Sequence, residues 1–270
     1  MKKILPHIVL ILIGIMFIFP FLWLLSTSFK SGTDASALSL NLIPKKINWE
    51  NYKEIFVKVP FLRYCINTLF LAIIGIVGQM LTSSMVAYSL SGINWWGKKV
   101  LFPIILSTIL LPYQVTMIPV YLIYNKLHLV GTYWPLIIPY FLASAINIFL
   151  MRQFFITLPT SLMEAASIDG ASHFTIYTKI ILPLSKPVLA AVSVFTFLNV
   201  WSDFLGPLIY INNQSMFTVS LGLKSFIGEH SVEWNLIMAA SAVTTIPIII
   251  IFFFAQKQFI EGITLTGIKG

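Results

Sequence analysis

The sequence is poor in charged residues and in cysteine. Asp, Glu, Lys and Arg make up only 10% of its 270 residues, whereas soluble domains carry about 25%. The single cysteine, Cys65, excludes an internal disulfide and is expected to be a small buried apolar residue. The four histidines are scattered, and no Cys/His cluster has metal-ligand spacing, so we expect no metal site.

Acidic residues are the scarcer of the two charged classes. Nine Asp and Glu stand against 17 Lys and Arg, and the formal net charge is +8. A basic chain can bind nucleic acid, but here the basic residues are dispersed between apolar runs instead of forming a patch. Nucleic acid is therefore not expected as a partner.

A nucleotide-binding motif is also missing. Residues 92–98, GINWWGK, match the beginning of a phosphate-binding P-loop. The next residue is Lys99 instead of the Ser or Thr that would hold Mg²⁺, and no strand is expected before the segment. We therefore expect this chain to bind no nucleotide and no other cofactor.

Apolar residues, by contrast, make up 58% of the chain, which predicts a membrane protein. Crossing about 30 Å of hydrocarbon takes about 20 helical residues, because only helices satisfy their own backbone polar groups there. The first apolar run is longer than a signal-peptide core and is interpreted as a retained span. An all-α, polytopic protein with six transmembrane helices in membrane lipid is predicted, with spans at 6–28, 66–90, 101–124, 133–154, 188–211 and 236–255.

Prolines occur inside two of these spans. Pro103, Pro112 and Pro119 lie in the third, and Pro135 and Pro139 lie in the fourth. Proline removes a backbone hydrogen bond, but transmembrane helices tolerate it because neighbouring groups satisfy the freed carbonyl. We therefore predict kinks and not breaks.

The even number of spans places both termini on one side of the membrane. The basic pairs Lys2-Lys3 and Lys98-Lys99 lie in short segments and favour the cytoplasm for the termini, by the positive-inside rule. Segments 91–100 and 155–187 and the C-terminal tail are then cytoplasmic as well.

The segment 155–187 has helix signals that an ordinary connector lacks. Ser161 and Glu164 have the spacing of a capping box, so a helix is expected to begin near Leu162. Gly170 is a natural residue to end that helix. Ser172 can cap a second short helix.

The second helix is expected to present one apolar face. Phe174, Tyr177 and Ile181 are spaced three or four residues apart, Pro183 is expected to end the helix, and Pro187 fits the first turn of the next span. Helices this short are marginal alone, so they need a surface to dock against.

Two surfaces could receive them, the membrane and a cytoplasmic partner protein. Anionic lipid would repel Glu164 and Asp169, whereas a partner's Arg or Lys could pair with them. Small Ala165 and Ala166 allow close approach, which also favours a partner groove.

The segment resembles the EAA loop of ABC-importer permeases. The likeness rests on Glu164-Ala165-Ala166, Asp169-Gly170-Ala171, Ile181-Leu182-Pro183 and Pro187. Over nearly its whole length, the chain is also similar to the second six-span permease of the carbohydrate branch. That branch includes maltose-type and glycerol-3-phosphate-type importers. This second likeness is carried by Asn67-Thr68, Met117-Ile118-Pro119, Gly131-Thr132-Tyr133-Trp134 and the ending Gly262-Ile263-Thr264…Gly267-Ile268-Lys269-Gly270.

The resemblance implies a type I ABC importer permease fold in the cell (inner) membrane of a prokaryote. A second permease subunit would complete a heterodimer, an ATPase dimer would bind ATP and Mg²⁺, and an extracytoplasmic substrate-binding protein would deliver a sugar or oligosaccharide. Residues 1–65 would form the first span and an external segment, 66–256 the permease core, and 257–270 a tail that either reaches between the ATPase subunits or is disordered. The residues implied in ATPase coupling are Glu164, Ala165, Ala166, Asp169, Gly170, Phe174, Tyr177 and Pro183.

Polar residues inside the spans are the candidates for substrate contact. Asp203 is the only carboxylate within a predicted span, although it could instead be an outer-interface residue that solvent reaches. Phe195 and Asn199 share its helix face and would suit a sugar's ring face and hydroxyls. Three other candidates, each of which could equally form an interhelical hydrogen bond, are Gln79, Gln114 and Asn147.

The alternatives to a transport subunit are a multi-span membrane enzyme and a membrane scaffold without a transport role. An enzyme would need paired intramembrane Asp residues, a Ser with a His or Lys base, or metal-ligand His, and no such set is visible in the sequence. A scaffold would not need a capped loop hinged at Gly170. We therefore expect a transport subunit, with ATP hydrolysis by a separate subunit.

Overall fold

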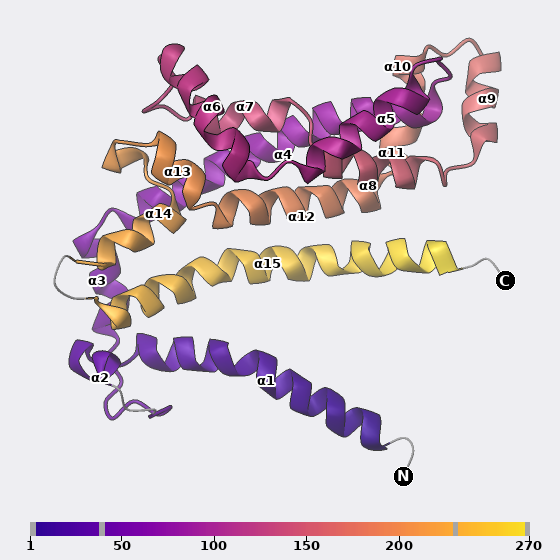
Figure 1. Cartoon of the computed structure of the whole chain (residues 1–270). Helices are drawn as coiled ribbons and strands as arrows, with labels where there is room; N and C mark the ends of the chain where they lie inside the picture. The colour runs from indigo at the N-terminus through magenta and orange to yellow at the C-terminus, as the bar shows by residue number, and fades with distance from the viewer. Residues whose placement is uncertain (1–3, 38–40, 229–231, 268–270) are drawn as a thin grey trace. The chain divides into compact units, whose positions relative to one another are not determined.

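The chain is helical throughout most of what the structure describes. The structure is a computed structural model that describes residues 4–37, 41–228 and 232–267, with side chains over 5–37, 41–228 and 232–256. Within those ranges there is no β-strand, only an isolated bridge between Ile227 and Val232 (Figure 1). The predicted all-α class is confirmed.

The described residues include four helices long and apolar enough to cross a membrane, and two bent pairs that reach this length together. Counting each pair as one span makes six, the predicted number. The four are Leu5–Ser28 in α1 (Ile4–Ser28), α4 (Phe61–Gly92), α7 (Trp134–Phe141) continued by α8 (Ala145–Phe155), and Trp234–Gln256 in α15 (Trp234–Gly267). The pairs join α5 (Lys98–Ser107) and η1 (Thr108–Leu110) to α6 (Tyr113–Lys126), and α10 (His173–Ile176), η2 (Tyr177–Ile181) and α11 (Leu182–Leu184) to α12 (Lys186–Ser202). The fifth span differs from the predicted span 188–211, because its pair includes residues 173–184 of the predicted cytoplasmic loop and α12 ends at Ser202.

The third predicted span is broken, so the prediction of kinks alone was wrong there. Its two halves are bent by 96° where Leu111 and Pro112 separate η1 from α6. Proline disfavours helical backbone at the residue before it and cannot continue the hydrogen-bond ladder. Leu111 is accordingly extended, with φ −81° and ψ 112°. Pro103 and Pro119 lie inside α5 and α6 without ending them.

The chain forms two compact units, and α4 and α15 contribute to both. One unit contains Met1–Asn67 and Phe217–Ile249, and the other contains Thr68–Met216 and Ile250–Gly270. The first includes α1, α2 (Gly32–Ser36), α3 (Glu50–Lys58), α14 (Val219–Leu223) and η4 (Lys224–Phe226). The second includes α5 to α12, among them α9 (Thr160–Ile168), as well as α13 (Leu205–Tyr210) and η3 (Gln214–Met216).

Asn51 is the polar centre of the first unit. Its side chain is 1% exposed, and its Nδ2 donates to the carbonyl oxygens of Ser28 at 2.7 Å and Lys30 at 2.8 Å. Its Oδ1 accepts from Nδ2 of Asn235 at 2.9 Å. Because a buried amide is stable only when it is hydrogen-bonded, Asn51 holds α3 against the end of α1 and the start of α15.

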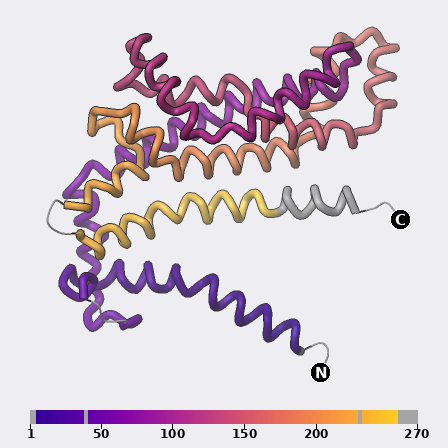
Figure 2. The backbone as a smooth tube through the Cα atoms, viewed as in Figure 1, coloured from indigo at the N-terminus to yellow at the C-terminus, as the bar shows by residue number. Residues whose placement is uncertain are grey.

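The second unit packs its spans closely. α12 contacts α8, and α13 contacts α7. Gly78 on α4 leaves room for the end of α7, since a Cβ there would lie 3.0 Å from the ring of Phe141 and from the carbonyl oxygen of Tyr140. The core combines residues of α4, α8, the 173–184 helix and α12: Ala87, Tyr88, Met151, Phe155, Ile176, Tyr177, Ile181, Val188, Leu189 and Val192. Figure 2 lets the backbone be followed from α8 through segment 155–187 to α12.

Candidate functional site

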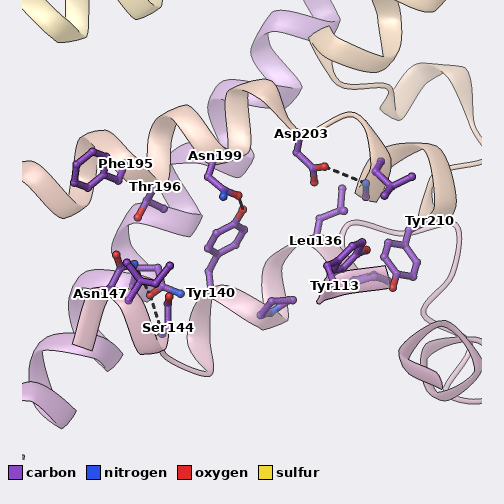
Figure 3. Close-up of a pocket in the computed structure, with 16 residues that line it drawn as sticks. Tyr113, Leu136, Tyr140, Ser144, Asn147, Phe195, Thr196, Asn199, Asp203 and Tyr210 are labelled. Atoms are coloured by element: carbon purple, nitrogen blue, oxygen red, sulfur yellow. Dashed lines mark hydrogen bonds between the residues drawn. The ribbon is translucent and has the colours of Figure 1, made fainter. Parts of the chain in front are cut away.

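A cavity of about 590 Å³ lies within the second unit, lined by residues of α4, α6, α7, α8, α12 and α13 (Figure 3). Its volume is in the range of about 300–1,000 Å³ that ligand pockets occupy. Five of the six residues that the sequence suggested for substrate contact line it, namely Gln79, Asn147, Phe195, Asn199 and Asp203. Gln114 does not, and its side chain is exposed on α6.

The cavity exists because the fourth span is interrupted beside it. α7 ends at Phe141, Ala143 has φ 58°, and α8 begins at Ala145. Non-helical backbone at membrane depth is tolerated where it lines a cavity and its polar groups find partners. Here the Ser144 amide donates to Oε1 of Gln79 at 3.2 Å and to Oγ of Ser83 at 3.1 Å.

Gln79 and Asn147 belong to the wall of the cavity. Gln79 is 3% exposed, and its Oε1 also accepts from Nδ2 of Asn147 at 3.0 Å and from Oγ of Ser83 at 2.8 Å. The alternative raised for these two amides, an interhelical hydrogen bond, is what the structure shows.

The α12 face presents Asn199 and Asp203 to the cavity. Oδ1 of Asn199 accepts from the Tyr140 hydroxyl at 3.2 Å, and Figure 3 shows the two side chains pointing toward each other. Asp203 is the C-cap of α12, partly buried, and its Oδ1 accepts from the Gly206 amide at 3.0 Å. A Cβ on Gly206 would lie 2.4 Å from Asp203 Oδ2, so this close approach requires glycine.

The sequence reasoning missed Thr196 and the tyrosines of the cavity. Thr196 is 4% exposed, and within the described part of the chain its hydroxyl has no hydrogen-bond partner. It follows Phe195 on the lining face of α12, so helical spacing could have indicated it. Tyr113, Tyr140 and Tyr210 come from three helices, and nothing local marks them.

In segment 155–187, the first helix ends where predicted but starts differently. α9 begins at Thr160 after Pro159, with no side-chain cap, so the predicted capping box from Ser161 to Glu164 is wrong. Ser161 already lies inside the helix, where its side chain no longer has the N-cap position. At the other end Gly170 has φ +77°.

The turn at Gly170 is a Schellman motif. The Gly170 amide donates to the carbonyl of Ser167 at 3.1 Å, and the Ala171 amide donates to the carbonyl of Ala166 at 2.9 Å. These bonds satisfy the last carbonyls of α9. The predicted ending of the first helix at Gly170 is confirmed.

The second helix starts as predicted and ends later. Oγ of Ser172 accepts from the Thr175 amide at 3.2 Å, which confirms the cap. Pro183 does not end the helix, which continues to Leu184 through the π-helical turn Tyr177–Ile181. The wider turn ahead of the proline relieves the clash of its ring with the carbonyl four residues earlier. Pro187 does lie in the first turn of α12.

Phe174 and Tyr177 keep the predicted common face, since their ring centroids lie 6.4 Å apart, but the two side chains differ in burial, which corrects the expectation that both are free to dock. Tyr177 is 6% exposed, its hydroxyl lies 2.6 Å from Oγ of Ser84 on α4, and its ring centroid lies 5.5 Å from that of Tyr88. Phe174 is 66% exposed. Tyr177 therefore anchors the segment to this chain's own α4 and is not free to contact another protein.

The exposed surface of the segment is mixed. Glu164, Ala165 and Asp169 are exposed on α9, and so is Ile168, which the sequence reasoning did not single out. Ala166 is partly buried and packs on the core of the second unit. An acidic and apolar strip is thus exposed on α9, while Ala166 packs the helix against the core of the second unit. We call the exposed residues Glu164, Ala165, Ile168 and Asp169 the α9 strip.

Known proteins with similar sequences belong to one family of transport proteins. Residues 79–264 match the family described as "Binding-protein-dependent transport system inner membrane component". The arabinooligosaccharides transport system permease protein AraQ of Halalkalibacterium halodurans is 35% identical, over 94% of this chain and 91% of the relative. The sn-glycerol-3-phosphate transport system permease protein UgpE of Shigella flexneri is 36% identical, over 84% of this chain and 83% of the relative.

A solved structure agrees over almost the full length. A chain of a bacterial ABC transporter involved in the import of the acidic polysaccharide alginate superposes with a TM-score of 0.83 at 25% identity, covering 95% of both chains. The resemblance to ABC-importer permeases that the sequence predicted is thereby confirmed. The chain belongs to the family of binding-protein-dependent transport system inner membrane components, the multi-pass permeases of ABC importers.

Proposed function

We propose that this chain is one of two permease subunits of an ATP-driven importer and forms half of the pathway for a sugar or oligosaccharide. The observation that carries the proposal is the cavity inside the permease fold, where aromatic rings, amides and one carboxylate converge. This combination suits the ring faces and hydroxyls of sugars. The name of the relative AraQ, an arabinooligosaccharides transport system permease protein, supports the same substrate class.

In this proposal, ATP and Mg²⁺ bind to a separate ATPase dimer. The second permease completes a heterodimer, and an extracytoplasmic binding protein delivers the sugar. Both termini and segment 155–187 face the cytoplasm of a prokaryotic cell. The tail 257–270 extends toward the ATPase; its backbone is helical up to Gly267, and residues 268–270 lie outside the described residues.

The α9 strip is the proposed contact with the ATPase. Glu164 and Asp169 pair with basic side chains of the ATPase, Ala165 permits close approach, and Ile168 and Phe174 add apolar contact. Closure of the ATPase dimer then moves α9, and the Schellman turn and the Tyr177 anchor carry that movement to α4 and α12 as a rigid body.

Transport is tested with the whole complex in proteoliposomes. Tritiated arabinotriose is supplied outside with the binding protein, and ATP is enclosed on the ATPase side. We expect ATP-dependent accumulation of the sugar. No accumulation of arabinotriose or maltotriose above the ATP-free background would contradict the proposed function.

Coupling is tested with Glu164→Gln in the same vesicles. We expect the permease pair to assemble while sugar uptake per ATP hydrolysed falls severalfold. Lys179→Gln, a charge change on the exposed part of η2 outside the α9 strip, is the matched control. Equal uptake by both variants would remove Glu164 from the coupling contact.

A further inference from the structure

The cavity carries a single charged side chain. Of the 16 residues that line it, Asp203 is the only carboxylate, and none is Lys, Arg or His. A charged ligand in such a site has to be matched by a group of opposite sign, because burial strips its water. The cavity offers no such group to an anion.

From this we infer that the cavity takes an uncharged, hydroxyl-rich sugar segment and rejects acidic sugars that carry a carboxylate on each ring. The inference rests on the proposed function and makes its substrate class narrower. It also sets this chain apart from the structurally similar alginate importer, whose cargo is an acidic polysaccharide.

Thr196 supports an uncharged ligand independently of Asp203. Its hydroxyl is shielded from solvent and has no partner among the described residues, although its side chain lines the cavity. Figure 3 shows Thr196 directed toward Ser144 and Asn147. A buried hydroxyl without a hydrogen-bond partner costs free energy. A small rotation that lets the Thr196 hydroxyl bond to a sugar hydroxyl is therefore favoured when sugar is present.

Asn199 and Asp203 offer the remaining hydrogen-bonding groups of the α12 face, one a neutral amide and the other a carboxylate that only accepts. Asn199 has one oxygen occupied by Tyr140 and an NH₂ group that can donate. Asp203 Oδ1 is held by the Gly206 amide, which leaves Oδ2 as an acceptor for a hydroxyl. A site built to hydrogen-bond hydroxyls discriminates strongly against ligands that leave its groups unmatched.

Aromatic side chains complete the site for a sugar. Phe195 is 49% exposed and Tyr140 lies next to Asn199, while Tyr113 and Tyr210 lie near Asp203 in Figure 3. Ring faces of this kind contact the C–H faces of sugars without using charge.

The test measures equilibrium binding to the solubilised complex of both permeases and the ATPase. The binding protein is left out so that its own selectivity does not enter. The probes are tritiated arabinotriose, which is neutral, and tritiated trigalacturonate, which has one carboxylate per ring. We expect arabinotriose to bind at least about tenfold more tightly, a difference of about 1.4 kcal/mol.

Two isosteric variants test the separate contributions of Thr196 and Asp203 to sugar binding. Thr196→Val keeps the volume and removes a destabilised hydroxyl, so it should fold, and we expect arabinotriose binding to weaken about fivefold, the loss of one hydrogen bond. Asp203→Asn keeps an acceptor for the Gly206 amide, and we expect trigalacturonate binding to strengthen severalfold. Ser193→Ala, on α12 but not lining the cavity, is the control and should change neither.

The outcomes separate this inference from the proposed function. Equal affinity for both sugars, no sugar binding at all, or a Thr196→Val effect no larger than that of Ser193→Ala would overturn the inference even if vesicles take up sugar. Failure of uptake in the proteoliposome assay would instead contradict the proposed function. Preference for arabinotriose together with both variant effects would establish the neutral-sugar site.

Discussion

The hydrogen bond between Tyr177 and Ser84 joins the 173–184 helix to α4, and its removal should loosen that helix by a predictable amount. The two hydroxyl oxygens lie 2.6 Å apart and are buried. Ser84 Oγ also donates to the carbonyl oxygen of Met80. Because Ser84 has one hydroxyl proton, the Tyr177 hydroxyl is the donor in the bond between them.

The magnitude follows from the kind of bond. A net hydrogen bond between neutral groups contributes about 1 kcal/mol, and interhelical bonds measured in a membrane protein average about 0.6 kcal/mol. Tyr177→Phe keeps the ring that packs against Tyr88. We therefore expect the equilibrium for opening of the 173–184 helix to rise about threefold to fivefold.

The assay is amide hydrogen exchange of the whole complex, read on peptides that cover 173–184. Tyr177→Phe and Ser84→Ala should each speed exchange, and the double variant should add little, giving a coupling energy of about 0.5–1 kcal/mol. Tyr88→Phe is the matched control, because no hydrogen bond of the Tyr88 hydroxyl is found within the described ranges. Additive effects of the two single variants, or an equal effect of Tyr88→Phe, would refute the reasoning.

Three further predictions follow from local geometry. Gly170→Ala should destabilise the α9 turn by about 1–2 kcal/mol through its φ of +77° alone, since a Cβ there has open space, and uptake per ATP should fall; unchanged exchange of α9 amides would contradict this. Gly206→Ala should lower the melting temperature and arabinotriose binding, because its Cβ would displace the Asp203 carboxylate, whereas Gly14→Ala, in open space on α1, should do neither. The hydrogen bond to Glu233, supported by Glu54, raises the pKa of Lys58. The stability that this ion pair contributes is therefore fully present below the unfolded lysine pKa of about 10.4, and it is lost as the pH rises through the higher pKa of the folded state. Because these side chains are about 40% exposed, the contribution stays below about 1 kcal/mol; melting curves from pH 9 to 11.5 should show a smaller alkaline loss in Lys58→Met, and parallel curves would disprove the link.

Several features set by neighbours in the sequence could be predicted from the sequence, although the capping box at Ser161, also a local signal, was wrong. The apolar runs locate the spans because their length alone matches the membrane. The Schellman turn at Gly170 and the cap at Ser172 use hydrogen bonds within a few residues, so glycine and serine at those positions were sufficient signals. The α12 face with Phe195, Asn199 and Asp203 followed from helical spacing, and all three line the cavity.

Features that depend on distant partners were decided only by the tertiary structure. The direction of Tyr177 is set by Ser84, 93 residues away, which turned a predicted docking residue into an internal anchor. The cavity depends on the break at Ala143, and that break is held by Gln79, 65 residues before Ser144. A local pattern indicates that a buried polar group needs a hydrogen-bond partner, but only packing between spans determines which partner lies within reach. The Thr196 hydroxyl, which has no hydrogen-bond partner among the described residues, is an example that the sequence could not reveal.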